Sequence, residues 1–268
     1  MALKKGVYLA TKKDGTIYYR SSITYKNKHI SLGSFDTEEL AHKAYLEATD
    51  ITGSEKKLSI TDYNKKKRTL SFEKWVVLIN FKDNGMYFKN PIYLRPKYFE
   101  YYLDNDPYAP LKFDVDDLFF YSTHKIMRRG GHLFVADYGM QINILNRYGI
   151  KNFAVAGKDY HFVNNDNTDY RYQNIRIINR YNGVTLEASP NGQPVYLAKI
   201  HINGDYIIGR YKTDAEAAVA YNKAVDRLAS NGFTINYQKN YVESLDSDQY
   251  TKLYESVKIS KKLRDLLP

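Results

Sequence analysis

The chain contains one segment twice, and this internal repeat restricts the folds that it can adopt more than any other feature. Residues 6–48 and residues 183–224 match in the same order, with one hairpin a residue shorter in the second copy. The matched pairs are Gly6 with Gly183, Val7 with Val184, Gly15 with Gly192, Tyr19 with Tyr196, Ile23 with Ile200, Gly33 with Gly209, Phe35 with Tyr211, Thr37 with Thr213, Ala44 with Ala220, and Tyr45 with Tyr221. Because chance does not produce so many ordered matches, we infer a duplicated structural module.

Each copy shows the same order of local signals. Three short segments rich in Tyr, Ile, Val and Leu are separated by turn signals, "KKDG" and "KNK" in the first copy and "SPNG" and "NG" in the second. This pattern predicts a three-stranded antiparallel meander followed by a helix that begins after Thr37 or Thr213 as N-cap. The small residues 217–220 allow the second helix to lie close to its sheet. One face of each sheet is therefore expected to be covered and the other open.

An open, basic, three-stranded face suits the major groove of DNA, which admits β-structure as well as helices. The segments "LGSFDTEELAHKAY" and "IGRYKTDAEAAVAY" resemble the AP2/ERF family of DNA-binding domains, which has "LGTF-T-EEAA-AY" at this place. The resemblance implies that outward side chains of the three strands contact DNA. Few of the Arg and Trp residues typical of the plant members are kept, so the plant target sequence is not expected here.

The resemblance also assigns candidate contact residues in both copies. In the first copy they are Tyr8, Ala10, Lys12, Tyr19, Arg20, Ser22, Thr24, His29 and Ser31. In the second copy they are Thr185, Glu187, Tyr196, Lys199, His201, Asp205 and Ile207. The alternative interpretation is that these strand faces are merely solvated.

The charge balance favours a polyanionic partner. The net charge is +10 and the isoelectric point is near 9.3. Lys65, Lys66, Lys67 and Arg68 form a basic run after the first copy. We expect this run to contact phosphates, which adds affinity without sequence information, although such runs are often only solubilising linkers.

Several classes of site and location are disfavoured by composition. The chain has no Cys, so it has no disulfide and no Cys-based zinc site. No apolar run approaches the ~20 residues that span a bilayer, and the start "MALKK" lacks the apolar core of a signal peptide. We expect a soluble, cytoplasmic protein, bacterial and located on DNA, with no membrane partner. No Gly-rich phosphate loop or nucleophile elbow is present.

The middle region is predicted to be a compact, aromatic-rich α/β stretch. Strands are predicted at "WVVLINF", "MYFKNPIYL" and "GHLFVADYG", a helix at "DVDDLFFYSTHKIMRR", and a short helix at "MQINILNRYGI" that ends at Gly149. His124 and His132 are interpreted as structural, and Arg128 and Arg129 as additions to a basic surface.

Residues 157–183, "GKDYHFVNNDNTDYRYQNIRIINRYNG", resemble the HNH, or ββα-metal, nuclease motif. Families that join HNH and AP2 domains are typically homing endonucleases of mobile DNA. The motif implies a metal ligand and a general base, which activates water while the metal stabilises charge on the phosphate. The residues that match the family's "D-R--NLR" are Asp169, Arg171, Asn174, Ile175 and Arg176.

The motif departs from the family pattern at the residues that carry the chemistry. An ungapped match places His161 at the ligand position and Phe162, which accepts no proton, at the general-base position. A shift by one residue makes His161 the base but places Tyr160 at the ligand position, and it reverses the strand faces. At the exit, Gly183 already begins the second repeat, so only Asn179 and Asn182 remain as candidate ligands.

These departures predict a retained fold with lost cleavage, and no cofactor. If the core is active instead, the catalytic candidates are His161, Asn174 and Asn182, with His161 as a ligand of Mg²⁺. Whether the chain is an enzyme stays open, with the balance against it. The loop "FVNNDNTD" is interpreted as turn-rich, because its spacing does not match an EF-hand.

The C-terminal segment predicts a helix from about Asp246 to Leu266. Leu253, Val257 and Leu263 lie at roughly helical spacing in it. The apolar side of this helix either covers the edge of a core or makes a homodimer contact, and the sequence does not decide between these.

The sequence therefore predicts an α+β chain in five parts. They are an AP2-like domain at 1–62, a basic linker at 63–74, a degenerate HNH-like domain at 75–182, a second AP2-like domain at 183–240 and a helical tail at 241–268. The predicted function is sequence-specific binding of double-stranded DNA, as a phage or mobile-element regulator derived from a homing endonuclease. The alternatives are an active Mg²⁺-dependent nuclease or nickase, and a scaffold that binds protein through the tyrosine-rich middle. A regulatory peptide or protein partner stays open.

Overall fold

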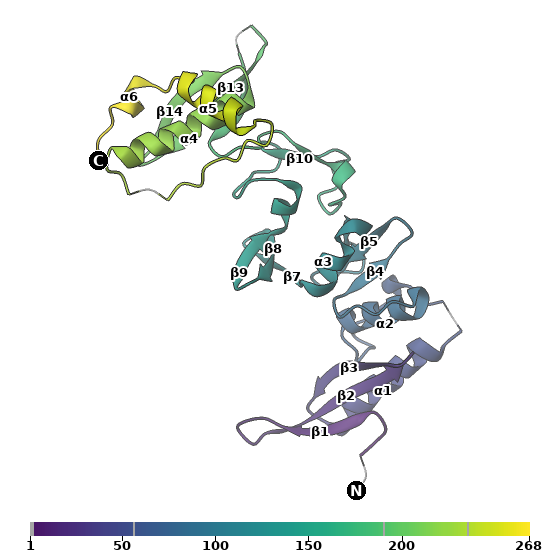
Figure 1. Cartoon of the computed structure of the whole chain (residues 1–268). Helices are drawn as coiled ribbons and strands as arrows, with labels where there is room; N and C mark the ends of the chain where they lie inside the picture. Colours follow the sequence, from purple (N-terminus) through teal and green to yellow (C-terminus); the bar gives the residue numbers. More distant parts are fainter. Residues whose placement is uncertain (1–2, 56, 190, 235) are drawn as a thin grey trace. The chain divides into compact units, whose positions relative to one another are not determined.

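The computed structural model describes residues 3–55, 57–189, 191–234 and 236–268. The chain is a mixed α+β protein with small antiparallel sheets, as predicted. Its described strands form four three-stranded sheets, β1–β2–β3, β4–β5–β6, β7–β8–β9 and β12–β13–β14, and one hairpin, β10–β11. The chain divides into two compact units, residues 1–143 with 166–174, and residues 144–165 with 175–268 (Figure 1). No helix in the described part of the chain is long and apolar enough to cross a bilayer.

Unit 1 holds the first repeat and most of the middle region. Its strands are β1 (Val7–Thr11), β2 (Ile17–Tyr25), β3 (Lys28–Phe35), β4 (Ile92–Leu94), β5 (Tyr98–Tyr101), β6 (Leu111–Asp114), β7 (Ile126–Arg129), β8 (His132–Asp137) and β9 (Met140–Asn143). Its α-helices are α1 (Glu38–Gly53), α2 (Phe72–Asn84) and α3 (Leu118–Thr123). Its 3₁₀ turns are η1 (Ile60–Asp62), η2 (Val115–Asp117) and η4 (Tyr172–Asn174).

Unit 2 holds the second repeat and the tail. Its strands are β10 (Tyr160–Phe162), β11 (Ile175–Ile177), β12 (Val184–Ala188), β13 (Pro194–His201) and β14 (Asp205–Tyr211). Its helices are α4 (Asp214–Ser230), α5 (Ser247–Ser256) and α6 (Lys261–Arg264), with one 3₁₀ turn, η3 (Ile144–Tyr148).

The predicted meander and helix are present in both repeats, and the two copies share an irregularity that the sequence pattern did not reveal. A β-bulge interrupts the register between Ser21 and Ser22 in β2 and between Ala198 and Lys199 in β13. Ser21 and Ala198 are equivalent positions, since Tyr19 matches Tyr196. A bulge bends the strand and increases its twist, so both sheets curve at the same point.

The same contacts connect helix and sheet in each repeat. Thr37 accepts a hydrogen bond from the Leu40 N–H, and Thr213 accepts one from the Glu216 N–H, which confirms both predicted N-caps. Before the first strand, Gly6 has φ +76° and Gly183 has φ +70°. An added Cβ at either glycine would overlap the ring of the helix tyrosine, Tyr45 in α1 or Tyr221 in α4. The repeated Gly and Tyr are therefore one packing contact.

The predicted strand at "WVVLINF" is wrong, because these residues lie in α2. Ser71 caps its N-terminus by accepting from the Lys74 N–H, and Gly85 ends it with φ +69°. Every residue from Trp75 to Phe81 is buried. A helix that is apolar all round gives the same continuous hydrophobic run as a buried strand, so periodicity does not separate the two.

Helix α2 packs into the same hydrophobic core as the first repeat. This core contains Ile30 and Leu32 of β3, Ala44 and Ala48 of α1, Leu70, and Phe72, Trp75, Leu78 and Ile79 of α2. Glu47 of α1 also accepts hydrogen bonds from the N–H groups of Thr69 and Leu70. The predicted five-part division stays a prediction, but packing is continuous across the predicted linker at 63–74.

The other predictions for the middle region are partly wrong. The helix expected over 114–129 is limited to η2 and α3, and the residues "IMRR" form β7. In "MQINILNRYGI" the first four residues form β9 and the next five form η3, which does end before Gly149. The strand in "MYFKNPIYL" is only β4, whereas β8 confirms the strand in "GHLFVADYG".

The C-terminal segment is two helices and not one. The helix does begin near Asp246, which is the N-cap of α5, but α5 ends at Ser256 and a non-helical stretch precedes α6. In that stretch the Ser260 N–H donates to the Ile208 carbonyl of β14, so a sheet contact replaces the helix. Val257 and Leu263 are buried in the core of the second repeat. The tail therefore covers the edge of its own core.

Candidate nucleic-acid interface

The open face of the first repeat is identified by the register of its three strands. Directly opposed residues in an antiparallel sheet point to the same side, and the buried Val7, Ile23 and Ile30 point to α1. The opposite face carries Tyr8 and Ala10 of β1, Tyr18, Arg20, Ser22 and Thr24 of β2, and His29, Ser31 and Ser34 of β3. This set includes every predicted strand contact of the first copy except Tyr19, which pairs with Leu9 on the helix side.

The chemistry of this face is basic and polar. No Asp or Glu occurs in β1, β2 or β3. Tyr8 is 54% exposed, and Arg20 is exposed between Tyr8 and Ser34 in one cross-strand row. Among the described residues, Arg20 has no ion pair. The Ser22 hydroxyl is buried in this face and has no hydrogen-bond partner among the described residues. The face thus offers donors and one cation with no competing carboxylate.

The open face of the second repeat follows from the same pairing. It carries Thr185 and Glu187 of β12, Val195, Leu197, Lys199 and His201 of β13, and Asp205, Ile207 and Arg210 of β14. Tyr196 pairs with Leu186 and Tyr211 on the helix side, so Tyr196, like Tyr19, does not lie on the outward face to which it was assigned. Tyr19 and Arg20 are consecutive strand residues, which point to opposite faces of a pleated sheet.

The charged groups of the second face contact one another. The Arg210 Nε atom lies 3.6 Å from Glu187 Oε2, and the Lys199 Nζ atom lies 3.4 Å from Asp205 Oδ2. His201 Nδ1 lies 2.9 Å from Asp205 Oδ1. The second face therefore differs from the first in holding two carboxylates, each already in contact with a cation or an imidazole.

Five residues on the two open faces were missed by sequence reasoning. They are Tyr18, Ser34, Val195, Leu197 and Arg210. Strict alternation from Arg20 would have found Tyr18, and alternation from Lys199 would have found Leu197 and Val195. Ser34 and Arg210 lie beyond the bulge on β3 and β14, where the count from the hairpin is displaced by one. The bulge was not recognisable from the residue types alone.

The predicted basic run lies in unit 1, and its residues differ in how exposed they are. Lys65, Lys66 and Lys67 are exposed in a turn stabilised by the Asn64 carbonyl, which accepts from the Lys67 and Arg68 N–H groups. The Arg68 guanidinium lies over the Trp75 ring, 4.8 Å from its centroid. The three lysines are thus available to phosphates, whereas Arg68 also packs on the core. Lys12 is exposed in the hairpin between β1 and β2.

Three of the residues that match the nuclease motif, Asp169, Arg171 and Asn174, form a hydrogen-bonded turn in unit 1, whereas Ile175 and Arg176 lie in β11 of unit 2. The Arg171 guanidinium donates to both Asp169 oxygens, at 2.8 and 2.6 Å, and Asp169 is 1% exposed. The Asn174 Nδ2 donates to the carbonyls of Asp169 and Asp166. In this turn, Asp169, Arg171 and Asn174 maintain the conformation of the segment 166–174.

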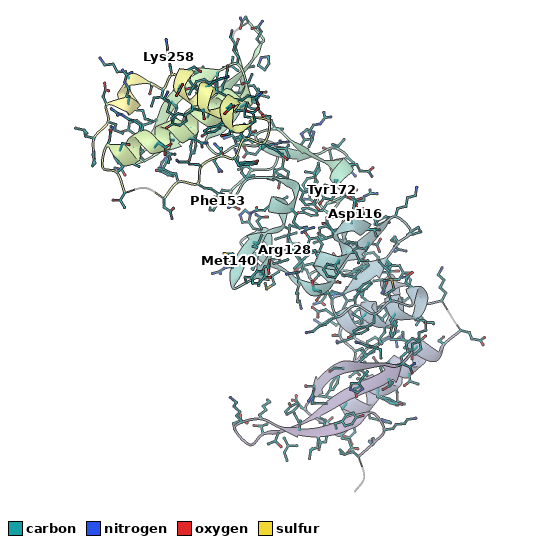
Figure 2. The ribbon with its side chains drawn as sticks, in the orientation of Figure 1. Asp116, Arg128, Met140, Phe153, Tyr172 and Lys258 are labelled. Carbon is teal, nitrogen blue, oxygen red and sulfur yellow. The ribbon has the colours of Figure 1, made fainter. Side chains whose placement is uncertain are left out.

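This segment docks on the edge of the β4–β5–β6 sheet. The Lys112 N–H donates to the Thr168 carbonyl and the Tyr170 N–H donates to the Lys112 carbonyl. The Tyr172 N–H donates to the Asp114 carboxylate, which places Tyr172 beside η2 and Asp116 (Figure 2). The segment that contains Asp169, Arg171 and Asn174 is therefore attached to β6 through an isolated β-bridge between Lys112 and Asp169.

The remaining nuclease candidates lie in unit 2, where each has contacts of its own. His161 is half-buried in β10 of unit 2, opposite Arg176, and the rings of Tyr160 and Phe162 contact each other. Asn179 uses its amide to bond the Lys158 carbonyl and the Leu186 N–H. Asn182 is joined through its backbone to the Asn240 side chain.

Within the described ranges, no three His, Asp or Glu side chains converge where they could hold a metal ion. The Asn174 Nδ2 donates to backbone carbonyls, and Asp169 is paired with Arg171. Strand β10, which contains His161, holds no Asp or Glu.

The two other histidines considered in the middle region differ in environment. His124 stacks on Phe120 with ring centroids 4.2 Å apart, and its Nε2 lies 3.5 Å from Asp137. His132 is exposed in β8. Arg128 pairs with Asp104 at 3.0 Å, whereas Arg129 is exposed. The contacts of His124 fit the predicted structural role.

We expect unit 1 to lose stability between about pH 4 and pH 2 through Asp166. Hydrogen bonds from the Thr168 hydroxyl and the Lys112 ammonium lower the pKa of Asp166 from its ordinary 3.8 to about 2. A depressed folded-state pKa stabilises the native state above the unfolded pKa, and this contribution disappears as pH falls through the folded value. After discounting for solvent screening it amounts to about 1 kcal/mol. Denaturant unfolding at the two pH values measures it, and Asp166→Asn is expected to show a smaller difference.

No protein-family model, curated protein or solved structure matches this chain.

Proposed function

We propose that this protein binds double-stranded DNA sequence-specifically, as a phage or mobile-element transcription regulator descended from an HNH/AP2 homing endonuclease that has lost cleavage. The observation that carries the proposal is the open face of the first repeat. It is a three-stranded antiparallel surface without carboxylates, with Arg20 at its centre and Lys12 in the adjoining hairpin. β-structure of this width enters the major groove, where base edges are distinguishable.

The surroundings of this face supply the non-specific part of the binding energy. The chain carries a net charge of +10, and Lys65, Lys66 and Lys67 are exposed on the same unit. Cations that neutralise phosphates release counterions, so affinity falls steeply as salt rises. The phosphate-contacting residues bind DNA of any sequence, and base contacts from the open face would then discriminate between sequences.

The loss of cleavage is supported by the use of the motif residues within the fold. Asp169, Arg171 and Asn174 are engaged in one buried turn, and Phe162 stands where a general base is needed. Such residues can persist for stability after catalysis is lost, because their removal would detach the segment from β6. The proposal therefore treats this region as part of the scaffold of a DNA-binding protein.

Selection from a pool of genomic and phage DNA fragments at rising salt tests the function. We expect a small set of fragments to stay bound at salt concentrations that release the others. Equal retention of all fragments would contradict sequence specificity, and no retention at physiological salt would favour the protein-binding alternative.

Arg20→Ala is expected to weaken binding to the selected fragment by about 5- to 150-fold, the range for one good base contact of about 1–3 kcal/mol. The matched control is Lys43→Ala, which removes the same charge from the exposed side of α1, away from the open face. We expect the control to stay within about twofold of the native protein. An equal loss in both variants would show that only net charge matters. Circular dichroism checks that both variants fold.

A further inference from the structure

The two open faces carry different charge chemistry at equivalent positions of the repeat. Glu187 stands where the first copy has Ala10, and Asp205 stands where it has His29. Both acids lie on the open face, since Glu187 pairs with Val195 and Asp205 pairs with His201. The second repeat thus holds two carboxylates at places where the first has none.

Each carboxylate is positioned to engage the basic groups of its own face. Asp205 lies between Lys199 and His201, at 3.4 and 2.9 Å, and Glu187 lies 3.6 Å from Arg210. The side chains concerned are between 37% and 73% exposed, so solvent and a ligand both reach them. No described Lys or Arg of this face is left without a carboxylate in contact. A phosphate approaching it would compete with these acids and would be repelled by them.

The Asp205 carboxylate is charged under the conditions in which DNA is bound. The hydrogen bonds from His201 and Lys199 hold the pKa of Asp205 below its ordinary value. The carboxylate therefore stays ionised at neutral pH, and it can only accept hydrogen bonds. In the major groove the donors available to it are the exocyclic amino groups of cytosine and adenine.

We propose that Glu187 and Asp205 are specificity-determining residues that make the second repeat reject arbitrary duplex DNA and accept sites presenting an amino group of cytosine or adenine to each acid. This inference rests on the proposed DNA binding and deepens it. On arbitrary DNA the acids remain close to phosphates or base acceptors, which is unfavourable. At a matching site they accept hydrogen bonds from the bases, and Lys199, His201 and Arg210 become available to neighbouring phosphates.

The two repeats then have unequal tasks. The first face, with no acid, gives most of the affinity and contacts bases through Arg20. The second face adds little affinity except at a matching site, so it contributes mainly to discrimination. A bipartite target is expected, in which the half bound by the second repeat is the more sensitive to substitution.

The test compares Asp205→Asn and Glu187→Gln with Glu243→Gln, which removes the same charge at an exposed position outside the strands. The probes are the selected fragment and a duplex of arbitrary sequence. We expect both face variants to bind the arbitrary duplex about 3- to 10-fold more tightly than Glu243→Gln does. The slope of log affinity against log salt is expected to steepen by about 0.9 for each further phosphate that the variant neutralises. Preference for the selected fragment is expected to fall about tenfold or more, as for the loss of one base contact.

A scan of base substitutions in the selected fragment gives a second readout. The native protein should require cytosine or adenine at specific positions, and Asp205→Asn should relax the requirement at one of them. The inference is overturned if the face variants bind the arbitrary duplex no more tightly than Glu243→Gln and keep the native base preference. If the native protein itself retains no duplex, the proposed function fails, and this is seen before any variant is compared.

Discussion

Replacing Gly6 with alanine is expected to lower the free energy of unfolding of unit 1 by about 2–5 kcal/mol. Two effects add. Gly6 has φ +76°, a conformation that is unfavourable by about 1–2 kcal/mol for a residue with a Cβ. The new methyl group would also overlap the ring of Tyr45, and overpacking of this kind costs about 1–3 kcal/mol.

Gly15→Ala separates these two effects. Gly15 lies in the hairpin of the same sheet with φ +87°, but an added Cβ there meets no atom within 4 Å. We expect this variant to lose only the conformational part, about 1–2 kcal/mol. The measurement is denaturant unfolding followed by the fluorescence of Trp75, which is the single tryptophan of the chain and is fully buried in the core of unit 1. Equal destabilisation by the two substitutions would refute the contact between Gly6 and Tyr45.

Replacing Leu263 with alanine is expected to destabilise unit 2 by about 2–5 kcal/mol, the range for a fully buried leucine. Leu263 of α6 is 0% exposed and packs in the same core as Ala217, Ala224 and Leu228 of α4. The alternative role for the tail was a homodimer contact, which would leave this side chain exposed in a single chain. Because Leu263 is buried within its own unit, replacing it with alanine removes packing contacts whether or not a second chain is present.

Leu267→Ala is the matched control, because Leu267 lies in the same tail and is 71% exposed. We expect it to change stability by less than about 0.5 kcal/mol. Thermal unfolding followed by calorimetry, repeated over a range of protein concentrations, distinguishes the two roles. A melting temperature of the native protein that rises with concentration, together with a small effect of Leu263→Ala, would indicate a dimer contact instead.

The local features of the repeats were predictable from sequence because their signals are local. Turn residues, alternating apolar residues and the caps Thr37 and Thr213 act within a few residues of where they stand. Because the module occurs twice, the same local signals for strands, turns and helix caps were present in both copies. The same reasoning failed at α2, where an unbroken apolar run is compatible with a strand or a buried helix, and only packing against α1 separates them.

The candidate site was predicted in outline and corrected in detail. The strands and most outward residues of the first repeat were found, but Tyr19 and Tyr196 were placed on the wrong face. To assign the side chains of a strand to the two faces of the sheet, the face of one residue must already be known. The buried Ile23 and Ile200 give this reference, but only after the helix has been placed on the sheet. The bulge that displaces Ser34 and Arg210 follows from inter-strand pairing, which composition does not encode.

The sequence by itself determined that the chain holds two copies of a sheet-and-helix module and that it is basic. Only the tertiary structure decided what the nuclease-like motif residues do and how the two faces differ. Asp169, Arg171 and Asn174 bond one another within the segment 166–174, and backbone bonds to Lys112 attach this segment to β6, far away in the chain. Glu187 and Asp205 contact Arg210, Lys199 and His201 because strand pairing places them on one side of the sheet. The attachment to β6 and the contact between Glu187 and Arg210 join residues that are distant in the chain, which local sequence signals do not specify.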